Sequence, residues 1–233
     1  MLKRDSIVGI LGGKGPEATN ILFQLIIKNT PIQAEEDHLR IIIDNNPWIP
    51  KPALGITGEG ENPIPALVDT ARNIERAGAD FIIIACNSAH YYIDEIQKAL
   101  NIPILNIIDE TVSAVKKSSF KRIGILATTG LINSNLYQSK FEAGGILALT
   151  PKEDDQYNLM NSILQFKNTG QKKELKNNVN RICRYFIQQG SEGIVIACTD
   201  IPVVFESQKL KTPYFDTLEI LARAAVRDAK KTD

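Results

Sequence analysis

The 233-residue sequence predicts an α/β protein built from two similar lobes, each a parallel sheet of about four strands flanked by helices. Two observations lead to this fold class. Short apolar runs of strand length alternate with segments of helical periodicity, which is typical of parallel sheets covered on both faces. Three of the strand segments recur in the second half of the chain in the same order, and this indicates an internal repeat.

The repeat is carried by three pairs of segments that lie about half a chain length apart. The pairs are Val8–Leu11 with Ile123–Leu126, Ile82–Cys86 with Ile194–Cys198, and Ile102–Leu105 with Thr212–Phe215. We therefore expect two pseudo-symmetric, Rossmann-like domains. The N-terminal lobe comprises residues 1–112 and a returning C-terminal helix from residues 216–233, and the C-terminal lobe comprises residues 113–215.

The first lobe is expected to hold four strands and the helices between them. A strand over Ser6–Leu11 ends at two glycines, and Pro16 then stands where a helix can begin, because its missing N–H is no loss in the first turn. Residues 45–63 are rich in proline and glycine and predict a long functional loop rather than an element. The other expected elements are a helix to Thr30, a strand over Leu39–Ile43, a helix over Pro65–Ala77, a strand over Asp80–Ala85, a helix over Ala89–Leu100 and a strand over Pro103–Ile107.

The second lobe is expected to repeat this order. Its strands are Arg122–Leu126, Ile146–Leu149, Gly193–Ala197 and Tyr214–Phe215, and its helices lie near Asn133–Ala143 and between about Glu153 and Gln189. A closing helix over Thr217–Lys230 carries apolar residues at helical spacing and is expected to pack back on the first lobe.

Composition excludes several classes of protein. Lysine and arginine number 27, as do aspartate and glutamate, so there is no charge excess to attract nucleic acid or an anionic membrane. No run reaches the roughly 18–20 apolar residues of a membrane span, and the N-terminus lacks the apolar core of a signal peptide. Three cysteines, an odd number, argue against a disulfide framework. We expect a cytoplasmic protein.

Two of the cysteines stand at matching places in the repeat. Cys86 and Cys198 each lie one residue beyond an expected strand, at the sheet edge where open parallel sheets bind ligands. Each is followed by polar residues and by the expected start of a helix, whose amide groups would stabilise a thiolate. Two lobes that face each other would bring these thiols to opposite sides of one cleft. Cys183 lies in a helical pattern and is expected in the core.

Cofactor and metal sites are not expected. The chain has only His38 and His90 and no Cys-x-x-Cys spacing, so no metal site is predicted. Gly13–Ala18 fits the dinucleotide fingerprint, with Asp44 where a ribose-binding acid can stand, but Pro16 is awkward in a phosphate cradle. A tight loop that offers N–H groups to a carboxylate is favoured instead. His90 is either a general base or a helix residue in polar surroundings.

Four motifs, in order along nearly the whole chain, resemble the aspartate/glutamate racemase family, and most of all its aspartate racemase branch. They are Gly-Gly-Lys-Gly-Pro-Glu-Ala-Thr at 12–19, Asp-Asn-Asn-Pro at 44–47, Cys-Asn-Ser-Ala-His at 86–90 and Ala-Cys-Thr-Asp-Ile-Pro at 197–202. The resemblance implies a PLP-independent, cofactor-free amino-acid racemase (an isomerase), with a small amino-acid substrate and a homodimeric assembly. The family's two catalytic cysteines correspond to Cys86 and Cys198.

The sequence departs from the family pattern at three places. Ser88 stands where the family usually has threonine, which keeps a hydroxyl. The loop that reads Ile-Pro-Asp-Arg-Thr in aspartate racemases, and whose arginine holds the side-chain carboxylate, has Pro52 in place of the arginine. Lys51 beside it is a flexible point charge and not a bidentate fork. Asp200 replaces the histidine of the glutamate branch, which argues against a cell-wall glutamate racemase.

Racemisation sets clear chemical requirements. A proton leaves Cα and another returns on the opposite face, so one acid/base group must be deprotonated and the other protonated. Because the Cα–H bond is a very weak acid, oriented donors in a dry cleft must stabilise the carbanion, with the 45–63 loop as a lid. The substrate-binding residues expected are Lys14, Asn45, Asn87, Ser88, Thr128, Thr129, Thr199 and, from the family resemblance, Lys167.

Other functions stay open at this stage. The chain could racemise glutamate or another amino acid, or carry out maleate isomerisation or malonate decarboxylation, as in arylmalonate decarboxylase, on the same fold. A nicotinamide-dependent enzyme would use the glycine loop. A catalytically silent sensor would bind an amino acid between two lobes, although the cysteine pair counts against it.

Overall fold

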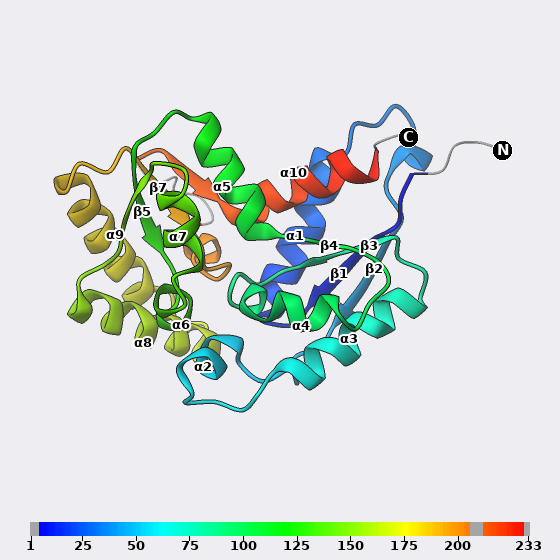
Figure 1. Cartoon of the computed structure of the whole chain (residues 1–233), viewed down its shortest axis with the longest axis horizontal. Helices are drawn as coiled ribbons and strands as arrows, with labels where there is room; N and C mark the ends of the chain where they lie inside the picture. The colour runs from blue at the N-terminus through cyan, green and yellow to red at the C-terminus, as the bar shows by residue number, and fades with distance from the viewer. Residues whose placement is uncertain (1–4, 206–211, 231–233) are drawn as a thin grey trace.

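The computed structural model describes residues 5–205 and 212–230, and it confirms the expected fold class of two parallel four-stranded sheets flanked by helices (Figure 1). Residues 1–4, considered above for a signal peptide, and 231–233, the end of the expected returning segment, lie outside the described residues. The strands are β1 (Val8–Gly12), β2 (Ile41–Asn45), β3 (Phe81–Ile84) and β4 (Ile104–Leu105), then β5 (Arg122–Leu126), β6 (Leu147–Leu149), β7 (Gly193–Ile196) and β8 (Tyr214–Asp216).

The two sheets have the same topology. Their strand orders are β2-β1-β3-β4 and β6-β5-β7-β8, and every neighbouring pair is parallel. Gly9 and Gly124 hold equivalent places in the central strands β1 and β5. A Cβ on Gly9 would lie 2.2 Å from Ile74 Cγ2, and one on Gly124 would lie 2.3 Å from Phe186 Cδ2. The repeated glycine therefore lets a helix pack directly on the middle of each sheet.

Helices cover both sheets. Those of the first half are α1 (Pro16–Asn29), α2 (Pro52–Thr57), α3 (Ile64–Arg76), α4 (Ile93–Gln97) and α5 (Ile107–Lys117), with 3-10 turns at Glu35–Asp37 and Ser88–Tyr92. Those of the second half are α6 (Thr129–Asn133), α7 (Leu136–Glu142), α8 (Glu153–Thr169), α9 (Lys173–Gln188) and α10 (Thr217–Ala229), with a 3-10 turn at Pro202–Phe205. Within the described residues, no helix combines the length and apolar character needed to cross a bilayer.

The prediction that residues 45–63 form only a loop is wrong, because α2 lies within them. Pro52 is its first residue, and Gly58 ends it with a φ of +78°. Proline in the first turn and glycine just past the last turn are the ordinary start and stop signals of a helix. Between them only six residues are helical, which is too short a stretch for periodicity to show.

Three other segments differ from the prediction. The expected helix over Ala89–Leu100 is a 3-10 turn followed by the short α4, and the strand expected over Pro103–Ile107 has only two residues. The expected helix near Asn133–Ala143 is two helices, interrupted at Asn135, which has a φ of +59°. No element was predicted where α5 lies.

The last helix of each half packs against the other half (Figure 1). α5 contacts α7 and β8, whereas α10 lies along α1 and α5. The Ser6 N–H donates to the Ala229 carbonyl at 3.1 Å, and the Arg227 guanidinium forms two 2.9 Å hydrogen bonds to Glu110. The expected lobe boundary after residue 112 falls inside α5.

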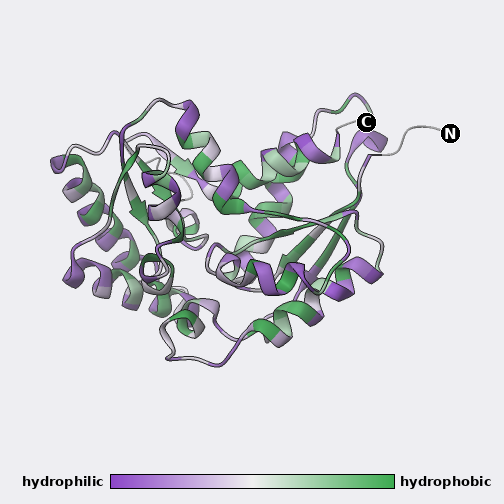
Figure 2. Ribbon diagram, viewed as in Figure 1, coloured by the Kyte–Doolittle hydropathy of each residue, from purple (hydrophilic) through white to green (hydrophobic). Residues whose placement is uncertain are grey.

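One hydrophobic core joins the two halves. It contains fully buried side chains from α1, α5, α7 and α10, among them Leu22, Ile107, Phe141 and Leu221. Two smaller clusters lie beneath α3 and α4 in the first half and beneath α8 and α9 in the second. Figure 2 shows the apolar strands enclosed by helices whose outer faces are hydrophilic.

Candidate active site

A pocket lies where the carboxyl ends of the two sheets face each other, and both Cys86 and Cys198 line it. Each cysteine follows the equivalent strand of its sheet, β3 or β7, by two residues. The other lining residues are Lys14, Lys51, Pro52, Ala53, Leu54, Asn87, Ser88, Thr128, Met160, Ile163, Leu164, Lys167, Ala197, Thr199 and Asp200.

Cys86 lies two residues before the 3-10 turn over Ser88–Tyr92. Burial raises the pKa of its thiol. The Lys167 ammonium and the backbone N–H groups of Ala89 and Ser88 act in the opposite direction and favour the thiolate. The first turn after the strand therefore directs its free amides at the sulfur, as the first turn of a helix would.

Cys198 is more deeply buried, with 4% of its surface exposed, and it faces a carboxylate. Its Sγ donates a hydrogen bond to Asp200 Oδ2 at 3.6 Å, and the same oxygen accepts from Lys167 Nζ at 2.9 Å. Burial raises the pKa of the Cys198 thiol, and the Asp200 charge raises it further, whereas Lys167 lowers it. In this state Cys198 holds its proton.

Lys167 remains charged in spite of its burial. Burial alone would lower its pKa, but the Asp200 carboxylate together with the Cys198 and Cys86 sulfurs outweighs this effect, and the pKa is raised. The Lys167–Asp200 pair lies against the glycine loop of the first half, since a Cβ on Gly15 would come within 3.4 Å of Asp200 Oδ1.

The expectation that both thiols have a lowered pKa is not met in this structure. Neither cysteine is followed directly by an α-helix, since 3-10 turns stand at both places. The amide groups there are fewer than at a helix N-terminus, and burial of the sulfur outweighs them. A positively charged ligand group in the pocket would shift the balance back toward a thiolate.

Lys14 is fixed by the loop that follows β2. Its Nζ donates to the Pro47 carbonyl at 2.7 Å and also to the Ile49 carbonyl, which leaves one N–H for the pocket. Burial and the neighbouring Lys167 lower its pKa. The Gly13 amide, expected to bind an anion, donates instead to the Thr19 hydroxyl at 3.0 Å.

The structure brings six of the eight expected substrate-binding residues to the pocket and leaves two outside. Ser88 Oγ and Thr128 Oγ1, one from each half, lie 3.0 Å apart. Asn45 is an exposed residue at the end of β2, and the Thr129 hydroxyl accepts from Gln156 Nε2 at 3.2 Å in a neighbouring cavity. The six that line the pocket are Lys14, Asn87, Ser88, Thr128, Lys167 and Thr199.

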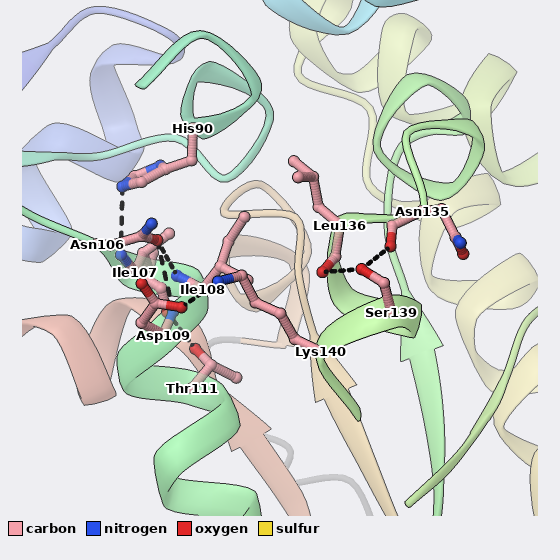
Figure 3. A network of polar contacts seen from close by, with 10 residues as sticks. All are labelled: His90, Asn106, Ile107, Ile108, Asp109, Thr111, Asn135, Leu136, Ser139 and Lys140. Atoms are coloured by element: carbon pink, nitrogen blue, oxygen red, sulfur yellow. Dashed lines mark hydrogen bonds and ion pairs between the residues drawn. The ribbon is translucent and has the colours of Figure 1, made fainter. Parts of the chain in front are cut away.

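His90 is a structural residue and not a general base. It is 2% exposed, its Nδ1 lies 2.9 Å from the Cys86 carbonyl oxygen, and its Nε2 accepts from the Ile107 N–H at 3.2 Å. Burial lowers its pKa to about 4, so the ring is neutral and both nitrogens are occupied. Figure 3 shows the hydrogen bond between His90 and Ile107 at the start of α5. The Asn106 side chain caps this helix, and Asp109 pairs with Lys140 at 2.6 Å.

Sequence reasoning missed the apolar wall of the pocket. Leu54 comes from α2, and Met160, Ile163 and Leu164 come from one face of α8. The spacing at 160, 163 and 164 is a helical signal, but it cannot distinguish a face that packs in the core from a face that lines a pocket. Asp200 could have been found, because it holds the same place after Cys198 as Ser88 does after Cys86.

This fold and site define an isomerase of the amino-acid racemase class. The chain belongs to the Asp/Glu/Hydantoin racemase family, whose model matches residues 11–225. The broad specificity amino-acid racemase RacX of Bacillus subtilis is 25% identical over 94% of this chain and 96% of its own length. The expectation of an amino-acid racemase is confirmed at this level.

Solved structures are similar over almost the whole chain. The aspartate racemase of Picrophilus torridus has a TM-score of 0.86 and 30% sequence identity, and the match covers 97% of this chain and 95% of that one. An aspartate racemase homologue from Pyrococcus horikoshii has a TM-score of 0.75 and 25% identity, with 99% and 100% covered.

Proposed function

We propose that Cys86 and Cys198 are the two acid/base groups of an amino-acid racemase. The observation that carries this proposal is that equivalent ends of the two repeated sheets contribute one thiol each to one pocket. One thiolate takes the proton from Cα, so that a C–H bond breaks and an S–H bond forms. The other thiol gives its proton to the opposite face of the carbanion. The reverse reaction exchanges the two roles.

The starting protonation state follows from the neighbours of each sulfur. Cys198 is the acid, because its proton lies in the hydrogen bond to Asp200. Burial raises the pKa of the Cys86 thiol as well, but Lys167 and two backbone amides act against it, so we assign Cys86 as the base. The α-ammonium group of the substrate adds a further positive charge beside it.

Polar groups around the thiols serve to stabilise the carbanion. The Ser88 and Thr128 hydroxyls, the Thr199 hydroxyl and the free N–H of Lys14 are the donors we assign to the substrate α-carboxylate. The apolar wall from α2 and α8 keeps water away, which strengthens these interactions. No step requires a group that the chain lacks.

We propose aspartate as the substrate. Among the charged residues lining the pocket there are three lysines and one aspartate, and that aspartate is already paired with Lys167. Such a pocket suits a substrate with two carboxylates, with Lys51 the candidate for the side-chain carboxylate. The similarity to the Picrophilus aspartate racemase supports the same choice.

A broader substrate range is the second candidate. Leu54, Met160 and Leu164 give the pocket an apolar side, and RacX of Bacillus subtilis is named for broad specificity. A panel of L-amino acids followed by chiral chromatography distinguishes the two. In a Lys51→Met variant the KM for aspartate rises if Lys51 binds the side chain, while the KM for apolar substrates does not.

The cysteine assignment is tested by Cys86→Ala and Cys198→Ala. Each change should abolish conversion of L-aspartate, and the wild-type product formed in D₂O should carry deuterium at Cα. Cys183→Ala is the control, because Cys183 is buried in the cluster under α8 and α9 and does not line the pocket. Near-normal turnover in either of the first two variants would rule out the two-base scheme.

We also propose a homodimer in a reducing compartment such as the cytoplasm. The mechanism needs Cys86 and Cys198 as free thiols, and both are free in the structure. The dimer rests on the family resemblance, and a mass of twice 25.8 kDa in light scattering would support it.

A further inference from the structure

The side chain of Asn87, the residue after Cys86, joins a loop of the first half to two helices of the second. Its Oδ1 accepts from the Tyr137 hydroxyl at 2.7 Å, and its Nδ2 donates to Thr217 Oγ1 at 2.9 Å. Tyr137 lies in α7, and Thr217 is the first residue of α10. One N–H of the Asn87 amide is left for the pocket.

Thr217 continues the connection to the second cysteine. Its hydroxyl donates to the Ile196 carbonyl at 3.0 Å. Ile196 is the last residue of β7, two residues before Cys198. Three consecutive hydrogen bonds therefore run from Tyr137 through Asn87 and Thr217 to the strand that carries Cys198.

These hydrogen bonds are closed off from water. The exposed fractions of Tyr137, Asn87 and Thr217 are 1%, 2% and 0%. A partner left unpaired there has no water to replace the lost bond, so each bond holds its neighbours firmly. Tyr137 and Thr217 do not line the pocket, so they can affect the reaction only through what they hold.

We propose that Thr217 and Tyr137 are positioning residues that hold, through Asn87, the Cys86 loop at the separation from Cys198 that transfer on opposite faces of Cα requires. The proposal rests on the two-cysteine function proposed above. Both sulfurs must reach the same carbon in one bound geometry, and a displacement of about 1 Å at a reacting group can lower the rate about 100-fold.

The test compares Thr217→Val, which keeps the shape but removes the hydroxyl, with Thr217→Ser, which keeps the hydroxyl. We expect Thr217→Val to lower kcat by about 10- to 100-fold with little change in KM, because misplacement acts on the chemical step. Thr217→Ser should restore most of the activity. Tyr137→Phe, which keeps the ring stacked on Phe141, should behave as Thr217→Val does.

Thr30→Val is the matched control. Thr30 is 6% exposed and its hydroxyl also donates to a backbone carbonyl, that of Ile26 at 2.7 Å, but it lies at the end of α1 away from the hydrogen-bonded path. Its kcat should stay at the wild-type value even if its melting temperature falls. Equal loss of kcat in Thr30→Val and Thr217→Val, or a Thr217→Ser variant as slow as Thr217→Val, would overturn the proposal.

A second readout does not depend on racemisation. The rate at which iodoacetamide alkylates Cys86, measured by mass spectrometry against Cys183 in the same sample, should change several-fold in Thr217→Val and Tyr137→Phe but not in Thr217→Ser. Unchanged Cys86 alkylation in both variants would overturn the positional link. Activity retained in Cys86→Ala would instead reject the two-cysteine function, while the alkylation rates would still report on the link.

Discussion

Lys167 is a cation whose charge reaches both proposed catalytic thiols. It lowers the pKa of Cys86 and of Cys198, and Asp200 holds it in place at 2.9 Å. It therefore provides the main positive charge that opposes the effect of burial on the two sulfurs. Lys167 therefore acts on both thiols electrostatically, in addition to the substrate-binding role proposed for it, and its position in the sequence could not show this effect.

Replacing Lys167 should move the pH profile. In Lys167→Met the lost positive charge raises the pKa of the thiol that must become the base, so the thiolate forms at higher pH. The acid limb of kcat/KM for aspartate should shift upward, and the rate at neutral pH should fall. The exposed Lys98→Met variant should leave the profile in place. An acid limb that stays put or moves downward in Lys167→Met would contradict this account.

At the same scale, the sequence could indicate a strand end but not the direction of each side chain. Thr128 and Thr129 both follow β5, yet only Thr128 lines the pocket, because Thr129 faces a different cavity as the first residue of α6. The repeat was a stronger guide, since it marked Cys86 and Cys198 as equivalent positions. The apolar wall gave no signal that distinguished it from core.

Among the elements, α2 forms one side of the pocket. It belongs to the first half in sequence, but it packs against α6 of the second half and supplies Pro52, Ala53 and Leu54 to the pocket. The fit is close, because a Cβ on Gly130 of α6 would lie 2.3 Å from the Ala53 carbonyl oxygen. A shift of α2 would open the side of the pocket.

Gly130→Ala should therefore weaken substrate binding. The new methyl group meets backbone and not a flexible side chain, so α2 must move, and we expect the KM for aspartate to rise about tenfold. Gly193→Ala is a steric control at the start of β7, where a Cβ would lie 2.9 Å from Phe120 Cε2, away from the pocket. It should lower stability by about 1–3 kcal/mol without raising KM. An unchanged KM in a folded Gly130→Ala variant would show that α2 does not control access.

The element predictions failed where a very short strand is followed almost at once by a helix. β4 has only two residues, and the stretch Pro103–Ile107, predicted as one strand, also contains Asn106 and the first residue of α5. The structure instead begins α5 at Ile107, where Asn106 accepts from the Ile108 N–H at 2.9 Å as an N-cap. Asp216 caps α10 in the same way, by accepting from the Leu218 N–H at 2.9 Å. α5 and α10 are therefore a further equivalent pair in the repeat, although comparison of the two halves of the sequence did not reveal them as a pair.

At the scale of the whole molecule, the sequence predicted two similar halves but not how they are joined. A repeat defines the topology inside each half, and it says nothing of which half a terminal helix packs against. We expect α10 to return to the first half, and in the structure it contacts α1 and α5. α5, the last helix of the first half, in turn packs against α7 and β8 of the second half. Each half therefore contributes its last helix to the other. The largest cluster consequently draws buried side chains from both sheets, including Ile83 and Val195.

This shared core predicts that the two halves unfold together. Leu221 comes from the second half of the sequence, is fully buried and belongs to the core that α10 shares with α1. Leu221→Ala should lower the free energy of unfolding by about 2–5 kcal/mol, with the exposed Ile32→Ala within about 0.5 kcal/mol of wild type.

Calorimetry should give one transition with equal calorimetric and van't Hoff enthalpies. Amide hydrogen exchange should show β1 and β5 losing protection by the same amount in Leu221→Ala, because neither sheet keeps a complete core once α10 loosens. Loss of protection in β1 alone, or two calorimetric transitions, would mean that the halves are independent folding units.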